Sequence, residues 1–312
     1  MNKRKPKVPK DIQRAIEIFP HIVSRNRLVG ARRQRLLETA FIPLAKKVRK
    51  EVNNRSRTAI KKLEPTKYHS WRLCPPGQHW VNEHPLTIPP SKSKPRGGVT
   101  TRRGHCHGNP SHRDQLYPDE MNEMRNLYFS ALNGLPNKDP SGRSERDQYD
   151  NLIRGWTQYW NEVFNPKEAL DPNLVKALIA TESDFNPKAD TRAKGFGRAR
   201  GLMQVTDGTR KILKDEKGEL QDRFVNVNDN QAYDPNLSIA SGIRWLFQKK
   251  KLAETKLGRE ASWEEAVLEY KSYLKEYQEL KMMPLNQKRS KRQKDAQQQI
   301  EKFLSYYGKL KS

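Results

Sequence analysis

A stripe of apolar residues predicts a helix that ends on one acidic side chain. The stripe consists of Leu174, Val175, Leu178 and Ile179, which repeat with the period of a helix. Asp171 is a preferred N-cap residue and Pro172 suits the first helical position, so the helix is expected to begin there. Glu182 lies four residues after Leu178 and therefore falls on the stripe. A carboxylic acid held protonated against apolar surface can donate its proton to a leaving group.

The same periodicity predicts helices elsewhere and defines the organisation of the chain. Residues 147–164 are expected to form an aromatic-rich helix, and residues 11–22 and 30–62 two further helices, the second interrupted at Pro43. A Pro/Gly/Ser-rich stretch at 140–144 is the expected linker. The predicted chain is mainly α, with a basic helical region at 1–67, a Cys/His-rich irregular segment at 68–138, a helical catalytic domain at 145–280 and a basic helical tail at 281–312.

The charge of the chain is strongly positive and unevenly distributed. Its 312 residues include 61 Lys and Arg against 36 Asp and Glu, a net charge of +25. Residues 1–70 hold 20 of these cations and only 5 acidic residues. Such a field attracts nucleic acid, anionic lipid or cell-wall polymers. No nucleic-acid recognition motif accompanies it, so no specific nucleic acid is expected as a partner.

Cysteine and histidine are concentrated in one segment. Both cysteines and six of the seven histidines fall between residues 69 and 112. Because Zn²⁺ is commonly held by Cys and His, a zinc site is predicted. Its expected ligands are Cys74, His79, His84, His105 and Cys106. The metal would staple the segment, or would activate water for an amidase with Asp114 or Glu120 as base. Two alternatives stay open, a Cys74–Cys106 disulfide and histidines that are ordinary loop residues.

Four ordered motifs resemble the soluble-lytic-transglycosylase domain of the lysozyme-like superfamily. They are Glu182-Ser183-x-Phe185-Asn186-Pro187-x-Ala189, Gly201-Leu202-Met203-Gln204-Val205, the helix start from Tyr233-Asp234-Pro235 to Gly242, and the helix from Trp263 to Tyr270. The resemblance covers about residues 155–280. It implies a lysozyme-like, α-helical catalytic domain preceded by the helical and Cys/His-rich regions.

The resemblance also implies a reaction. The family cleaves the β-1,4 bond between N-acetylmuramic acid and N-acetylglucosamine in peptidoglycan, without a cofactor. Glu182 matches its general acid and base, which closes the muramyl 6-hydroxyl onto C1 and leaves a 1,6-anhydro product. Positions that line the sugar cleft or lie near the acid are matched by Ser183, Met203, Gln204 and Tyr270; for Met203, core packing is an alternative. The family usually has Asn after this tyrosine, whereas Lys271 stands here, which changes one expected substrate contact.

Other functions remain open at this point. A hydrolytic muramidase would deliver water, often with a second acid near the first. Candidates for that acid are Asp184, Asp190, Asp207 and Asp229, none of which stands in a recognisable motif. The further alternatives are a bifunctional enzyme with an N-terminal zinc amidase, and a non-catalytic adaptor that binds cell wall or nucleic acid.

The basic N-terminus is not followed by an apolar segment long enough for a signal peptide, and no apolar run is long enough to span a membrane. We therefore expect synthesis in the cytoplasm and action in the periplasm or cell wall of a target cell. Delivery as an antibacterial effector is favoured, with a secretion apparatus or an immunity protein as partner. A phage lysin and a conjugative apparatus are the alternatives.

Overall fold

The computed structural model describes residues 69–193, 195–284 and 287–312. The predicted basic region at 1–67, with its two expected helices, lies outside these residues. Residues 68–312 belong to one compact unit, so the predicted Cys/His-rich segment and the predicted catalytic domain lie together in it. Within the described ranges, no helix is long and apolar enough to cross a membrane.

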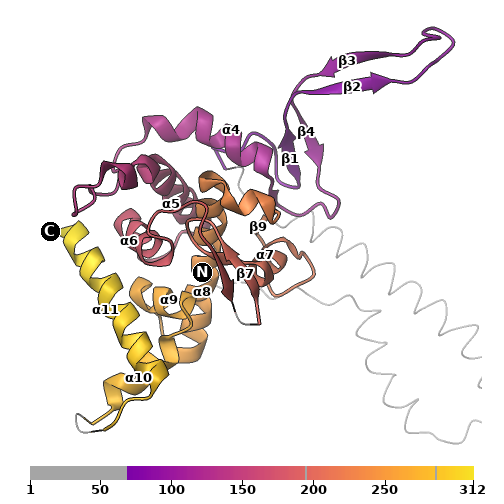
Figure 1. The fold of residues 1–312 in the computed structure, drawn as a ribbon. Coiled ribbons are helices and arrows are strands. Elements are labelled where there is room, and N and C mark those ends of the chain that lie inside the picture. The colour runs from indigo at the N-terminus through magenta and orange to yellow at the C-terminus, as the bar shows by residue number, and fades with distance from the viewer. Residues whose placement is uncertain (1–68, 194, 285–286) are drawn as a thin grey trace, which may run out of the picture. The chain divides into compact units, whose positions relative to one another are not determined.

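Helices dominate the described part of the chain, which confirms the predicted mainly α class (Figure 1). The α-helices are α4 (Pro118–Tyr128), α5 (Asp150–Phe164), α6 (Pro172–Glu182), α7 (Asp207–Lys214), α8 (Pro235–Leu257), α9 (Trp263–Tyr270), α10 (Leu274–Met282) and α11 (Lys291–Lys311). Short 3₁₀ turns are η2 (Phe129–Ala131), η3 (Ser144–Tyr149) and η4 (Asn230–Tyr233). The aromatic-rich helix predicted at 147–164 is formed by η3 and α5.

In the described ranges, strands form four small sheets. Antiparallel pairs join β1 (Gln78–Val81) to β4 (His105–Gly108), and β2 (His84–Ile88) to β3 (Gly98–Arg102). A parallel pair joins β5 (Gln115–Leu116) to β9 (Phe224–Val225), and β6 (Asp190–Ala193), β7 (Gly197–Arg200) and β8 (Val205–Thr206) form a three-stranded sheet. The segment predicted to be irregular thus contains strands. The β5–β9 pair connects it to the catalytic part of the chain.

The core is built around α8, which packs against α4, α5 and α9 (Figure 1). Trp156 and Trp160 of α5 are fully buried, and their indole N–H groups donate to Asn236 Oδ1 at 2.7 Å and to the Ala240 carbonyl at 3.0 Å. Buried indoles need such partners because an unsatisfied N–H loses its bond to water. The aromatic residues of α5 therefore belong to the core.

The helix that carries the candidate acid begins as the sequence predicts. Asp171 caps α6, because its carboxylate accepts the backbone N–H of Asn173 at 2.9 Å, and Pro172 occupies the first turn. The Tyr307 hydroxyl of α11 donates to the same carboxylate at 2.9 Å. Helix α11 packs along α6, so the basic tail supports the helix that ends on Glu182.

One buried charge cluster lies beneath α6 and predicts a pH dependence of stability. The ammonium of the fully buried Lys176 lies 2.5 Å from Asp147 Oδ1 and 2.8 Å from Asp150 Oδ1. Two carboxylates thus share one cation. Burial, together with the charge of Asp147 and against the attraction of Lys176, raises the pKa of Asp150 to about 6 from an ordinary value of 3.8.

We expect Asp150→Asn to stabilise the protein at pH 7 but not at pH 4. The folded state retains the Asp150 proton up to about pH 6, whereas the unfolded state releases it near 3.8, so stability falls as pH rises between these values. The neutral amide avoids that loss, a gain of up to about 3 kcal/mol at pH 7. Urea unfolding at pH 4 and pH 7 measures it. An equal change in unfolding free energy at both pH values would contradict the assignment.

Candidate active site

Glu182 lies at the C-terminal end of α6, where the chain reverses sharply. Asp184 and Phe185 both have positive φ angles, +50° and +61°, a conformation that is uncommon for residues other than glycine. Phe185 is buried and stacks on Tyr149. The Ser183 hydroxyl donates to the Leu202 carbonyl at 2.8 Å. The turn after Glu182 is therefore held by packing on one side and by the Gly-Leu-Met-Gln segment on the other.

The Gly201–Gln204 turn is held just as firmly. Gly201 has a φ angle of +76°, and a Cβ there would collide with the Ala232 carbonyl, so only glycine fits. The Gln204 amide donates to the carbonyls of Ala189 at 3.1 Å and Gly201 at 2.9 Å, and its oxygen accepts the Thr191 hydroxyl at 2.6 Å. These bonds use the polar atoms with which Gln204 was predicted to hold a sugar.

The remaining predicted cleft residues connect this turn to the end of α9. Met203 is 0% exposed and its side chain packs where Gly242 leaves room on α8. The Tyr270 hydroxyl donates to the Met203 carbonyl at 2.7 Å. Burial, and secondarily the charge of Glu182, raises the pKa of Tyr270 well above its usual value, so the phenol stays a neutral donor. Hydrogen bonds thus connect Ser183, after Glu182, and Tyr270 to the turn that contains Met203 and Gln204. Their role as substrate contacts stays a prediction.

The polar partner of Glu182 is Lys271. Its Nζ donates to Glu182 Oε1 at 2.5 Å, and the two side chains are 6% and 17% exposed. Lys271 follows directly after α9, where the backbone turns through Ser272 at a φ angle of +60°. The sequence marked Lys271 only as a departure from the family pattern. The ion pair joins residues 89 positions apart, so no local pattern indicated it.

Each candidate for a second catalytic acid is held by an arginine. Pairs in the described part of the chain are Asp184 with Arg146, Asp190 with Arg198, Asp207 with Arg200 and Arg210, and Asp229 with Arg210. Hydrogen bonds from Arg198 and Tyr233 lower the pKa of Asp190. Burial opposes ionisation of Asp207, but the Arg198 N–H and the cations of Arg200 and Arg210 outweigh it and lower its pKa. All four acids are therefore engaged in ion pairs with arginine.

Comparison with known families agrees with this geometry. Residues 159–295 match the family model of the transglycosylase SLT domain. That part of the chain is an SLT transglycosylase domain of the lysozyme-like superfamily, as the four motifs predicted. Such domains are peptidoglycan glycosidases of the lytic-transglycosylase type and need no cofactor. No curated protein matches the chain.

The matched range separates the residues that belong to the SLT family pattern from those that lie outside it. It includes Glu182, Gln204 and the consecutive residues Tyr270 and Lys271. It leaves out the Cys/His-rich segment, α4 and most of α11. The contacts of those elements with the domain are therefore additions to the family pattern.

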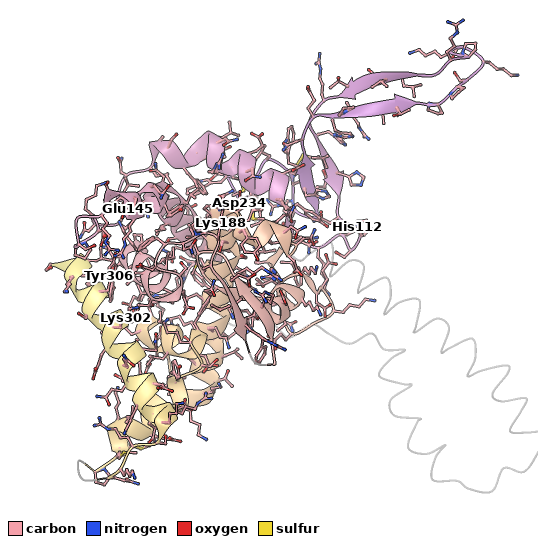
Figure 2. The ribbon with its side chains drawn as sticks, in the orientation of Figure 1. His112, Glu145, Lys188, Asp234, Lys302 and Tyr306 are labelled. Atoms are coloured by element: carbon pink, nitrogen blue, oxygen red, sulfur yellow. A yellow bond between two sulfur atoms is a disulfide. The ribbon has the colours of Figure 1, made fainter. Side chains whose placement is uncertain are left out.

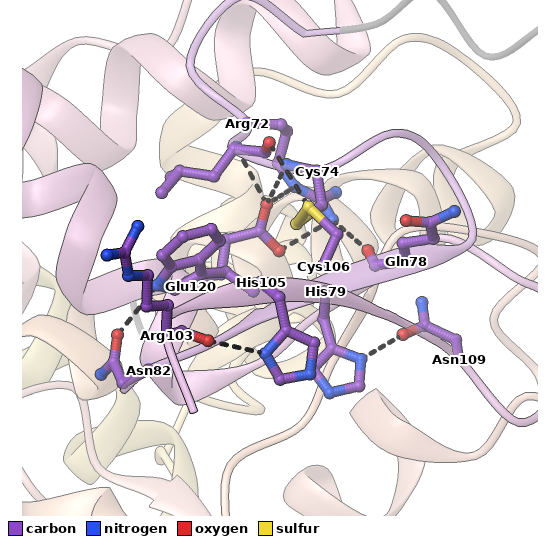
Figure 3. The surroundings of a disulfide bond; sticks show 12 residues. Arg72, Cys74, Gln78, His79, Asn82, Arg103, His105, Cys106, Asn109 and Glu120 are labelled. Carbon is purple, nitrogen blue, oxygen red and sulfur yellow. Dashed lines mark hydrogen bonds and ion pairs between the residues drawn. A yellow bond between two sulfur atoms is a disulfide. The ribbon is translucent and has the colours of Figure 1, made fainter. Parts of the chain in front are cut away.

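The predicted zinc site is not formed, because Cys74 and Cys106 are joined to each other in a disulfide (Figure 3). A disulfide sulfur is not a thiolate and cannot serve as the expected ligand. The imidazoles are directed to other partners: His79 to Asn109 Oδ1 at 2.7 Å, and His84 and His105 to backbone carbonyls. Among the described residues, no group of three or more His, Cys, Asp and Glu side chains is placed to hold a metal ion. The disulfide alternative is the one that the structure supports.

The two acids proposed as amidase bases, Asp114 and Glu120, accept hydrogen bonds from Arg72. Arg72 donates to Glu120 at 2.7 and 3.0 Å and to Asp114 at 2.6 Å. Glu120 additionally accepts the backbone N–H groups of Leu73 and Cys74 (Figure 3). This network fixes the disulfide against α4. These residues therefore form a structural disulfide with its supporting hydrogen bonds, not a metal centre.

Reduction of the disulfide is expected to destabilise the protein. The bond joins residues 32 positions apart, and closing such a loop in the unfolded chain corresponds to about 3–4 kcal/mol. Cys74→Ser/Cys106→Ser should therefore unfold at lower temperature than the oxidised protein, and dithiothreitol should have little further effect on it. Thermal unfolding with and without dithiothreitol measures both. An unchanged midpoint after verified reduction would show that the disulfide carries none of the stability.

Proposed function

We propose that this chain is a lytic transglycosylase in which Glu182 acts alone, first as general acid and then as general base. The observation that carries the proposal is the placement of Glu182 at the partly buried C-terminal end of α6, inside the SLT domain, with Lys271 as its polar partner. The arginine pairing of the four other candidate acids supports a mechanism with one carboxyl group. A hydrolase that positions water with a second carboxylate would have to use one of these paired acids.

The reaction follows from one carboxyl group that acts twice. Protonated Glu182 gives its proton to the glycosidic oxygen as the bond from that oxygen to muramyl C1 breaks. The resulting carboxylate takes the proton of the muramyl 6-hydroxyl, whose oxygen forms a new bond to C1. The products are a 1,6-anhydromuramyl end and a free 4-hydroxyl, and no water is consumed.

Lys271 acts in this mechanism as a positioning residue. Its ammonium holds Oε1, so Oε2 is the oxygen that exchanges the proton. The ammonium also stabilises the negative charge that appears on Glu182 when the proton leaves. It occupies the position where the family usually has Asn, so a charged donor stands where a neutral one is usual.

Lys271→Met is expected to lower kcat by about tenfold to hundredfold, with a much smaller change in KM, because the lost contact acts on the proton-transferring group. Lys271→Asn, which restores a neutral donor, should recover part of the rate. Lys275→Met on α10 is a matched control, since Lys275 is exposed and makes a surface pair with Glu279. Release of soluble muropeptides from purified sacculi measures the rates. A Lys271→Met variant faster than wild type would contradict this role and show that the ion pair restrains the enzyme.

The direct test of the function is mass spectrometry of the products. The oxidised full-length chain is incubated with purified sacculi, and the released fragments are separated and weighed. The proposal expects 1,6-anhydromuramyl ends. Reducing muramic ends would establish a muramidase, stem-free glycan an amidase, and binding without products an adaptor.

We further infer that the chain acts in the periplasm or cell wall, as an antibacterial effector with a secretion apparatus or immunity protein as partner. The Cys74–Cys106 disulfide supports an oxidising compartment. The peptidoglycan substrate of the SLT domain lies in the same compartment. The net charge of +25 favours binding to an anionic envelope.

A further inference from the structure

A cavity of about 260 Å³ opens between the end of α6 and the C-terminal helix. Its lining from α6 and the following turn is Ala180, Thr181 and Asp184. Arg146 of η3 contributes a cation, and α11 contributes Lys302, Ser305, Tyr306 and Lys309. Thr181 and Asp184 flank Glu182 in the chain, although Glu182 itself is not part of the lining. All of the α11 lining lies beyond the matched SLT range.

The polar face of α11 is directed into this cavity by helical spacing. Lys302, Ser305, Tyr306 and Lys309 are spaced three, four and seven residues apart, which places them on one side of the helix. The other side, with Phe303, Tyr307 and Leu310, is buried in the core. Figure 2 shows Lys302 and Tyr306 along this helix. The face is therefore fixed by the packing of α11 and does not depend on a loop.

The cavity keeps a net positive charge after the ion pairs between its own side chains are taken into account. Arg146 Nη2 lies 2.5 Å from Asp184 Oδ1, and the same guanidinium reaches the buried Asp139 at 3.4 Å. Tyr306 donates to Asp139 at 2.8 Å; burial, and then this bond, raises the pKa of its hydroxyl, which stays a neutral donor. Neither Lys302 nor Lys309 has an acidic partner among the described residues. Two ammonium groups are thus left for an anion.

We propose that this cavity is a subsite for a carboxylate of the peptide stem carried by the muramyl residue at the cleavage site. This proposal rests on the proposed function. Lys302 and Lys309 would bind the carboxylate by charge-assisted hydrogen bonds. The stem is attached to the sugar whose bond is cleaved, and residues on both sides of Glu182 in the chain line the cavity. A fully extended stem of four residues spans up to about 13 Å. The subsite makes the enzyme prefer stem-bearing over stem-free glycan.

A purely structural role for the lysines predicts a different outcome. Cations near the C-terminal end of α6 would also stabilise its dipole. Their replacement would then lower thermal stability and would affect all substrates alike. A stem-binding role instead separates two substrates that differ only in the stem.

The kinetic test uses soluble, uncross-linked peptidoglycan strands free of teichoic acid, before and after removal of the stems by an amidase. For Lys302→Glu/Lys309→Glu we expect the KM for stem-bearing strands to rise about tenfold or more, with kcat little changed. Cleavage of stem-free strands should be unaffected. Lys291→Glu/Lys294→Glu is the control, with the same charge change on exposed residues of the same helix outside the cavity. Equal effects on both substrates, or none on stem-bearing strands, would overturn the proposal.

A binding test keeps the subsite separate from catalysis. Glu182→Gln is titrated calorimetrically with a muramyl tetrapeptide and with the same compound after amidation of its carboxyl groups. The proposal expects the free acid to bind at least about tenfold more tightly, and the advantage to vanish with Lys302→Glu/Lys309→Glu. Equal affinity of the two compounds overturns it. If wild type cleaves neither strand, the proposed function fails, and the titration still decides the subsite.

Discussion

Glu182→Gln is expected to abolish peptidoglycan cleavage while the protein stays folded. The amide has nearly the same shape and keeps an oxygen that can accept the Lys271 ammonium, but it has no acidic proton to give and does not act as a base. Because one group serves both steps, we expect a loss of at least about 10³-fold in kcat. Release of muropeptides from sacculi measures the rate, and circular dichroism with thermal unfolding verifies the fold.

A matched control separates this effect from loss of surface charge. Asp229→Asn makes the same carboxylate-to-amide change at an acid that is 65% exposed and paired with Arg210. It should retain activity within about threefold. If Glu182→Gln turned over sacculi at the wild-type rate, the assignment of Glu182 would have to be abandoned. If Asp229→Asn lost as much activity as Glu182→Gln, a two-carboxylate hydrolase would be the better description.

Arg72→Met is expected to cost about 3–5 kcal/mol of stability. Arg72 is the cation between Glu120, which is 0% exposed, and Asp114. Removal of the guanidinium leaves a buried carboxylate uncompensated, which is far more costly than the net strength of the pair. Urea unfolding of the oxidised protein measures the change. Arg125→Met on the exposed side of α4 is the control and should change stability by less than about 0.5 kcal/mol.

The single variant Glu120→Met and the double variant Arg72→Met/Glu120→Met complete a double-mutant cycle with Arg72→Met. The double variant removes both buried charges, so most of the loss should be recovered, because apolar side chains of similar volume replace the pair. Asp114 keeps a cation in the double variant, since Arg223 lies 2.6 Å from it. Destabilisation of the double variant by the sum of the two single effects would show that Arg72 and Glu120 do not act as a pair.

The helix that carries Glu182 was predictable because its signals are local. Its cap, its first-turn proline and its apolar stripe all lie within twelve residues, and the structure confirms each of them. The SLT domain was predictable because its motifs occur in a fixed order along the chain. In both cases, short-range patterns determine the result.

What the sequence did not predict depends on pairing between distant residues. Cys74 and Cys106 have the chemistry of a metal site and of a disulfide alike, and only the fold, which places Cys74 beside Cys106 of β4, decides between the two. The Glu182–Lys271 ion pair joins α6 to the end of α9, and nothing near either residue indicates it. Motif matching also does not distinguish a substrate contact from a structural bond, as the internal hydrogen bonds of Gln204 and Ser183 illustrate.

The most direct test of the single-carboxyl mechanism is digestion of sacculi in water enriched in ¹⁸O. A transglycosylase uses the muramyl 6-hydroxyl as nucleophile, so the new ends should be 1,6-anhydro sugars without the label. A hydrolase places water oxygen on C1, so its reducing ends would carry ¹⁸O. We predict unlabelled anhydro ends from the wild-type chain and no products from Glu182→Gln. Labelled reducing ends as the main product would contradict the mechanism and establish a muramidase.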